Sequence, residues 1–198
     1  YNYNKKIFSD LGLEIPTTYE EFKTVCQTIQ EAGIVPIYEA TQSAWHQCVP
    51  LYGSGPYYEK LEPGLYEALN NNTKDIKDVA MMKTILEQMK EFAELGYYGE
   101  DYLSNTVDAA KDEIGTGRAA MYLAAPGFAL QVEDQYPDMK DQIGIFLIKR
   151  HDLSYLRSVR FMLSRHYLRH KTAYACSYIN CRIMISLCHG TRQNNMSV

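Results

Sequence analysis

The sequence lacks most of the patterns that catalytic and membrane-spanning proteins need. It has no apolar run long enough to cross a bilayer. It also has no H-E-x-x-H helix, no G-x-S-x-G turn and no glycine-rich dinucleotide pattern, and His46 is the only His before residue 149. We therefore expect a protein that is not an enzyme, with no catalytic residues, no metal and no cofactor.

Acidic residues are almost absent after residue 148. Residues 1–148 contain 11 Lys and Arg against 23 Asp and Glu, whereas residues 149–198 contain nine Lys and Arg against one acid, Asp152. Seven of those nine are Arg, and four of the five His also lie there. No linker composition marks the change, which falls at the end of an apolar run, where natural domains rarely end.

Three interpretations of residues 149–198 compete. One is a nucleic-acid- or membrane-binding arm, because four arginines form a basic and partly helical stripe: Arg157, Arg160, Arg165 and Arg169. Another is a metal site, whose ligands would be Cys176, Cys181, Cys188 and His189, although their spacings fit no usual zinc pattern. The third is a reading frame that shifts near residue 148. We favour the frameshift and expect no folded domain in the tail.

Apolar periodicity predicts two amphipathic helices and three buried strands in the first part of the chain. Apolar residues recur every three or four positions in 19–33 and in 78–95, which is typical of helices with one buried face. Short apolar runs at 34–38, 119–123 and 143–147 are bounded by Gly or Pro and predict strands. Helices that alternate with buried strands indicate an α/β fold.

Residues 3–22 contain the end of one helix and the start of the next. Gly12 is expected to end the first helix, and Pro16 disfavours helical geometry in the residue before it. Thr18 and Glu21 then have the spacing of a capping box at the start of the second helix.

Four segments resemble, in the same order, the extracellular solute-binding proteins of ABC importers, in particular sugar-binding family 1, which includes maltose-binding protein. The segments are Y-N-K-K-I-F-S-D-L-G-L-E-I-P-T-T-Y-E-E-F at 3–22, E-A-G-I-V-P-I-Y at 31–38, A-W-H-Q at 44–47 and D-A-A-K-D-E-I-G-T-G-R-A-A-M-Y-L at 108–123. The last of these is the most specific match. The resemblance covers about residues 1–148.

This resemblance implies an α/β fold of the type II periplasmic-binding-protein class, with residues 1–148 as a partial second lobe that is truncated at its N-terminus. It implies capture of a sugar or oligosaccharide and delivery to the membrane subunits of an ABC permease. The protein would be extracellular, either a membrane-anchored lipoprotein or periplasmic, and we expect a monomer that binds no nucleic acid.

The resemblance also indicates where a ligand would bind. Sugars present flat C–H faces rimmed by hydroxyls, so their sites combine aromatic rings with carboxylates or amides. Trp45, the only Trp, stands in a polar loop beside Gln42 and His46. We expect these three residues to contact the ligand, although Trp45 could instead anchor the core beneath the loop.

A second candidate segment is A-A-P-G-F at 124–128. Family members place a Trp here that stacks on the sugar. In this chain the aromatic residue is Phe128, or it is absent if Gly127 takes that position. Binding and simple packing are equally good interpretations of Phe128.

Two alternatives stay open in the sequence. A carbohydrate-active enzyme fragment could bring carboxylates together from distant loops. Cys26 and Cys48 could form a disulfide in an exported protein, but spacing cannot show that the required geometry is met.

Overall fold

The computed structural model describes residues 1–148 of the 198-residue chain. The frameshift, the basic arm and the cysteine-rich metal site predicted for the tail lie outside the described residues. The helices in the described part are α1 (Lys5–Asp10), α2 (Tyr19–Glu31), α3 (Val49–Gly53), α4 (Gly55–Leu61), α5 (Leu65–Asn70), α6 (Ala80–Glu94), α7 (Ala110–Gly115) and α8 (Phe128–Gln135). Four short 3-10 turns within residues 1–148 are η1 (His46–Cys48), η2 (Ile76–Asp78), η3 (Tyr102–Ser104) and η4 (Pro137–Met139).

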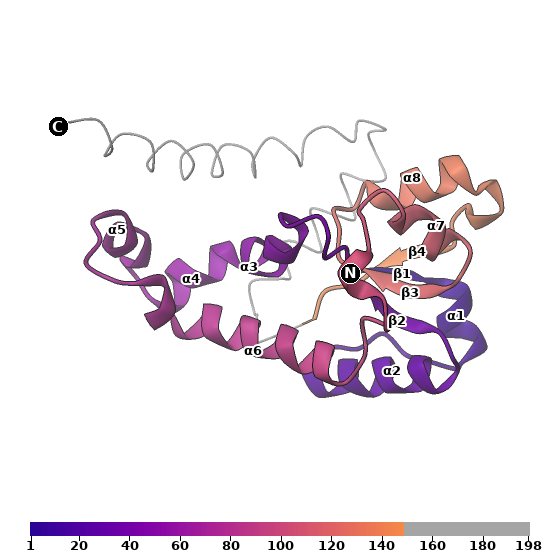
Figure 1. Ribbon diagram of the computed structural model, residues 1–198, viewed down its shortest axis with the longest axis horizontal. Helices are drawn as coiled ribbons and strands as arrows, with labels where there is room; N and C mark the ends of the chain where they lie inside the picture. Colours follow the sequence, from indigo (N-terminus) through magenta and orange to yellow (C-terminus); the bar gives the residue numbers. More distant parts are fainter. Residues whose placement is uncertain (149–198) are drawn as a thin grey trace. The chain divides into compact units, whose positions relative to one another are not determined.

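Four strands of the described part form one mixed sheet in the order β2-β3-β1-β4 (Figure 1). They are β1 (Asn2–Asn4), β2 (Val35–Tyr38), β3 (Ala119–Tyr122) and β4 (Ile143–Ile145). β2 runs parallel to β3, whereas β1 runs antiparallel to both β3 and β4. Because β2 and β3 are parallel, the loops that follow them leave the sheet at the same edge.

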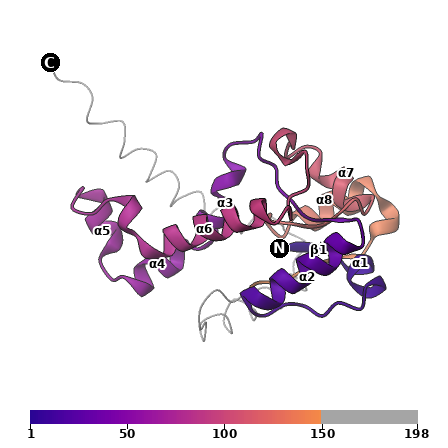
Figure 2. The same ribbon diagram turned by 60° about the horizontal axis from the view of Figure 1, so that its bottom comes forward.

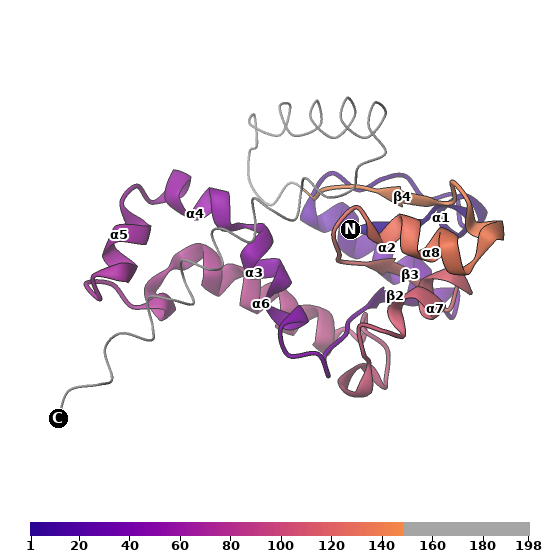
Figure 3. The same cartoon turned by 90° about the horizontal axis from the view of Figure 1, so that it is seen from above.

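Helices cover both faces of this sheet (Figure 3). On one face α1, α2 and the end of α6 pack on Ile37 of β2 and Met121 of β3. On the other face α7 and α8 pack on Tyr38 and Tyr122. Both faces being buried explains why β3 reads as a continuous apolar run, Ala-Ala-Met-Tyr, and not as an alternating one.

Helices α3, α4 and α5 form a helical extension beside α6 (Figure 2). A separate small core holds it together, formed by Tyr58, Leu65, Val79 and Ile85. The other end of α6 is tied to α2. There the Glu91 carboxylate accepts hydrogen bonds from the Tyr19 hydroxyl at 2.6 Å and from Lys23 Nζ at 3.1 Å. Both hydrogen bonds lower the pKa of the Glu91 carboxyl group, and the one from Tyr19 has the larger effect.

The predicted helices and strands are confirmed, with small shifts at their ends. The amphipathic segments become α2 and α6, and the three apolar runs become β2, β3 and β4. Gly12 and Gly96 follow the ends of α1 and α6 with φ of 63° and 74°, a conformation that glycine adopts without strain.

Strand β1 is not predicted by the sequence, because Asn is depleted in strands. One tertiary and one local hydrogen bond account for its asparagines. Asn2 is fully buried, and its Nδ2 donates to the Ala124 carbonyl at 3.0 Å. Asn4 caps α1, since its Oδ1 accepts from the Lys6 backbone N–H at 3.0 Å.

We expect Thr18→Ala to lower the free energy of unfolding by about 1 kcal/mol. The predicted capping box is present: Thr18 Oγ1 accepts from the Glu21 backbone N–H at 3.2 Å, and the Glu21 carboxylate accepts from the Thr18 backbone N–H at 3.1 Å. Urea unfolding followed by circular dichroism measures the loss. The control is Thr24→Ala, an exposed position inside the same helix, where Ala is the better helix former. Equal losses in the two variants would contradict the capping role.

In residues 1–148, none of the helices combines the length and the apolar composition that a bilayer-spanning segment requires.

Candidate functional site

The candidate site lies at the edge of the sheet where β2 and β3 end. Residues 39–48 follow β2, and residues 123–127 follow β3 and lead into α8. The carboxyl ends of parallel strands are a common place for binding sites, because loops from neighbouring strands converge there.

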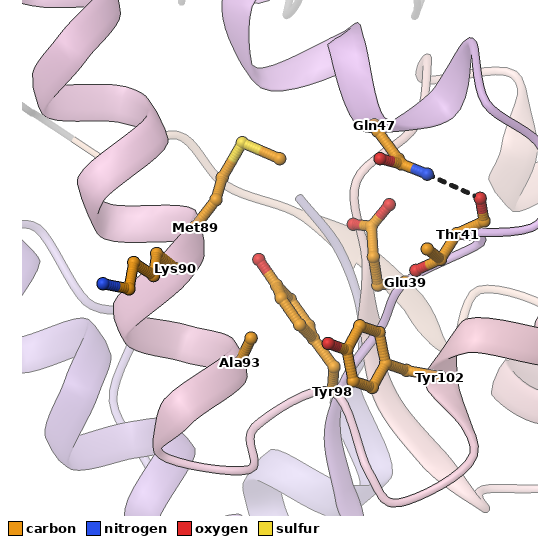
Figure 4. Close-up of a pocket in the computed structure, with 8 residues that line it drawn as sticks. All are labelled: Glu39, Thr41, Gln47, Met89, Lys90, Ala93, Tyr98 and Tyr102. Carbon is orange, nitrogen blue, oxygen red and sulfur yellow. Dashed lines mark hydrogen bonds between the residues drawn. The ribbon is translucent and has the colours of Figure 1, made fainter.

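A cavity of about 180 Å³ opens beside the end of β2 (Figure 4). The loop after β2 and η1 form one wall, and α6 forms the opposite wall. The segment after α6 supplies two tyrosine rings between them. The lining residues are Glu39, Thr41, Gln47, Met89, Lys90, Ala93, Tyr98 and Tyr102.

Glu39 and His46 form a buried pair at this cavity. Their side chains are 7% and 1% exposed, and Glu39 Oε1 lies 2.8 Å from His46 Nδ1. The other ring nitrogen of His46 lies 3.0 Å from the Leu123 carbonyl oxygen. His46 therefore links the loop after β2 to the residue that follows β3.

The ring of His46 also stacks on Tyr122, with centroids 4.9 Å apart and ring planes 4° from parallel. Burial raises the pKa of the Tyr122 phenol above its usual range, and the nearby Glu39 carboxylate raises it further. Tyr122 thus keeps its proton and provides a rigid aromatic floor under His46. His46 is thus a buried residue held on three sides, and it supports the loop.

Trp45 is 60% exposed, and its ring meets the edge of the His46 ring at a centroid distance of 5.5 Å. Such exposure is incompatible with the alternative that Trp45 anchors the core. The loop therefore presents a large aromatic face to solvent directly beside a buried, fixed imidazole.

Gln42 and Gln47 occupy the same loop. Gln42 is exposed, and its backbone N–H donates to the Asn105 carbonyl at 3.0 Å. Gln47 lines the cavity, where its Nε2 donates to the Thr41 carbonyl at 2.7 Å (Figure 4). Both residues thus help to hold the loop in place.

Gly127 and Phe128 lie at the start of α8. Phe128 is 5% exposed, and its ring centroid is 4.7 Å from that of Tyr122, so its contacts are packing contacts. Gly127 is half-buried, and a Cβ added to it would meet no atom within 4 Å. Neither residue supplies an aromatic face to solvent here.

Sequence reasoning missed the residues that line the cavity. The sequence did give a signal for Glu39, because it follows directly after an apolar strand and a charged residue is rarely buried unless it has a partner. The sequence gave no such signal for the cavity tyrosines, Tyr98 and Tyr102. They follow α6, far from Glu39 in the sequence, and reach the cavity only through the packing of α6.

Neither a metal site nor a disulfide is present in the described part. No cluster of His, Cys, Asp and Glu within residues 1–148 could hold a metal ion. Cys26 and Cys48 are both free thiols. Burial raises the pKa of the Cys26 thiol, which makes it inert.

Comparison with known proteins identifies the family. The model of the bacterial extracellular solute-binding proteins matches residues 2–150, most of the chain. The chain belongs to this family. The sequence-based prediction of the family is confirmed, and so is the prediction that the chain is not an enzyme, because these are solute-binding proteins. Among curated proteins, no sequence match was found.

Solved structures of solute-binding proteins share the fold. A chitin oligosaccharide binding protein superposes with a TM-score of 0.62 at 20% identity, over 75% of this chain and 36% of its own. The bacterial solute receptor AcbH, described as having an exclusive preference for β-D-galactopyranose, gives 0.60 at 20% identity, over 78% and 37%. A Bacillus licheniformis sugar transporter in complex with stachyose gives 0.59 at 19% identity, over 77% and 40%.

This solute-binding chain spans less than half the length of those structures. Together with the partial sheet, this coverage confirms the predicted α/β fold of a partial lobe.

Proposed function

We propose that this chain is part of the extracellular component of an ABC importer, which captures a sugar or oligosaccharide. The family is one of bacterial extracellular solute-binding proteins, and the similar structures bind chitin oligosaccharide, galactopyranose and stachyose. In this proposal the ligand is held between two lobes that close about a hinge, and the membrane subunits of the permease distinguish the closed form from the open one.

The observation that carries the proposal is the exposed Trp45 face in the loop that also forms one wall of a cavity lined by two tyrosine rings and a carboxylate. A flat ring can stack on the C–H face of a sugar, while carboxylate, hydroxyl and amide groups take its hydroxyls. Both features lie at one edge of the sheet, where a second lobe could close over them.

The remaining features of the proposal concern the rest of the protein. We propose that residues 1–148 form a partial lobe and that residues 149–198, out of frame, contribute no folded domain. The working protein would be a monomer, either anchored outside the cell as a lipoprotein or free in the periplasm, with no nucleic acid as partner.

Sugar binding by the complete product of the gene tests the proposal. The probes are chitotriose, D-galactose, stachyose and xylotriose, each titrated by calorimetry. Saturable binding of at least one sugar without turnover is the expected result. No binding to any of the four, or hydrolysis of one of them, contradicts the proposal.

We expect Trp45→Ala to weaken binding of the best of these sugars by more than tenfold, about 1.4 kcal/mol. A stacking residue of this kind commonly contributes that much or more to an interface. Calorimetric titration of the variant gives the ratio of dissociation constants.

The control is Tyr52→Ala, which removes an aromatic side chain of similar exposure, 53%, from α3 in the helical extension. Its affinity should match that of the wild type. If Trp45→Ala binds the sugar as tightly as the wild type, Trp45 is a surface residue that does not contact the ligand.

A further inference from the structure

One oxygen atom at the cavity of Figure 4 is buried without the hydrogen bond that such atoms normally make, and one carboxylate there is engaged through a single oxygen. Thr41 Oγ1 is buried and has no hydrogen-bond partner within the described residues. Glu39 is 5% exposed, and its hydrogen bond to His46 uses Oε1 alone. An unpaired buried hydroxyl is destabilising, so a bound partner at the cavity would account for it.

The pair of Glu39 and His46 is electrically neutral as a whole. The Leu123 carbonyl can only accept, so His46 Nε2 must donate to it at 3.0 Å. One further proton must then lie between His46 Nδ1 and Glu39 Oε1, which are 2.8 Å apart. Whether it sits on the imidazole or on the carboxyl group, the charges of the pair sum to zero.

This neutrality decides what kind of ligand the cavity suits. An isolated buried carboxylate would favour a cation, but here the proton shared with His46 already compensates it. The other charged group of the cavity, Lys90, lies 3.5 Å from Glu94 and keeps its side chain 75% exposed. What the cavity offers inward is therefore an acceptor oxygen, a hydroxyl and two tyrosine rings.

We propose that this cavity is a subsite for one uncharged sugar ring, with Glu39 Oε2 accepting from a ring hydroxyl and Thr41 Oγ1 bonding to a neighbouring one. The inference rests on the proposed function and adds the residues that recognise the hydroxyls. A volume of about 180 Å³ is below the range of about 300–1,000 Å³ that is usual for larger ligands, which suits a single ring.

The side chains are placed for this role. Figure 4 shows the Glu39 carboxylate turned toward the open space between Gln47, Met89 and Tyr98. The tyrosines supply apolar faces for the C–H groups of a ring, and the Gln47 amide is already engaged with Thr41. His46 acts only through Glu39 and is a positioning residue.

The test compares Thr41→Val and Glu39→Gln in the complete gene product. The probe is whichever of chitotriose, D-galactose, stachyose and xylotriose binds the wild type most tightly. Thr41→Val keeps the shape and removes the unpaired hydroxyl, so the thermal midpoint should stay the same or rise while affinity falls at least fivefold. Glu39→Gln leaves only an amide oxygen, a weaker acceptor than a carboxylate, and should weaken binding at least threefold.

Matched controls are Thr84→Val and Glu87→Gln, the same chemical changes at exposed positions on α6. Both should bind within twofold of the wild type. Wild-type affinity in both Thr41→Val and Glu39→Gln overturns the subsite and leaves the proposed function standing. Absence of binding in the wild type overturns the proposed function, and the subsite with it. If Glu39→Gln does not fold, Thr41→Val alone decides.

Discussion

The 198-residue chain, produced by itself, should bind sugar with a dissociation constant above 1 mM. This affinity is at least a thousandfold weaker than that of the complete gene product for the same sugar. A thousandfold change corresponds to about 4 kcal/mol. The chain spans only 36–40% of the similar sugar-binding structures, so under the proposed function much of the cleft is contributed by other segments. Contacts from one side of the cleft alone must also offset all the entropy that the ligand loses when it is immobilised.

Calorimetry on the chain and on the complete gene product measures this difference. Circular dichroism and amide hydrogen exchange of the chain are the controls, because an unfolded chain would also fail to bind. Submillimolar affinity in the folded chain contradicts the expectation. In that case the Trp45 loop and the cavity at the end of β2 would be sufficient for recognition.

His46→Leu should destabilise the protein by about 2–4 kcal/mol, because it leaves the buried Glu39 carboxyl group and the Leu123 carbonyl without their hydrogen bonds. Glu39 would keep its burial at 5% exposed and lose its shared proton. The Leu123 carbonyl would lose its donor as well, and the loop that carries Trp45 would lose its attachment to the end of β3. Urea unfolding of the complete gene product measures the loss.

A double variant separates the charge from the packing. Glu39→Leu together with His46→Leu leaves no buried carboxylate, so it should be more stable than His46→Leu alone by at least 1 kcal/mol. Equal or lower stability of the double variant would show that the stacking of His46 on Tyr122, and not the pair, holds the loop. The exposed control Glu87→Leu should change stability by less than about 0.5 kcal/mol.

Local chemistry explains which parts of the fold were predictable from the sequence. The capping box of Thr18 and Glu21 and the glycine after α1 act between residues close in sequence, so their spacing is sufficient to recognise them. The periodicity of α2 and α6 follows from burial of one face. Strand β1 was missed because its buried Asn2 gains its partner from Ala124, 122 residues away.

The candidate site divides in the same way. Trp45 could be singled out because it is the only Trp and stands among polar residues, and its exposure agrees with a surface role. His46 was named beside it, but the sequence could not show that its ring is buried between Glu39, Leu123 and Tyr122. Phe128 had two equal interpretations, and its burial against Tyr122 favours packing.

The sequence by itself determined the family, the α/β class and the loop that carries Trp45, because each depends on short motifs and on patterns repeated over neighbouring residues. Only the tertiary structure decided that Glu39 and His46 pair, that Thr41 keeps an unpaired hydroxyl, and that Tyr98 and Tyr102 reach the same cavity. These facts depend on which distant segments meet when β2, β3 and α6 pack together. These tertiary contacts determine which side chains are buried and which share a proton. The spacing of residues along the chain does not.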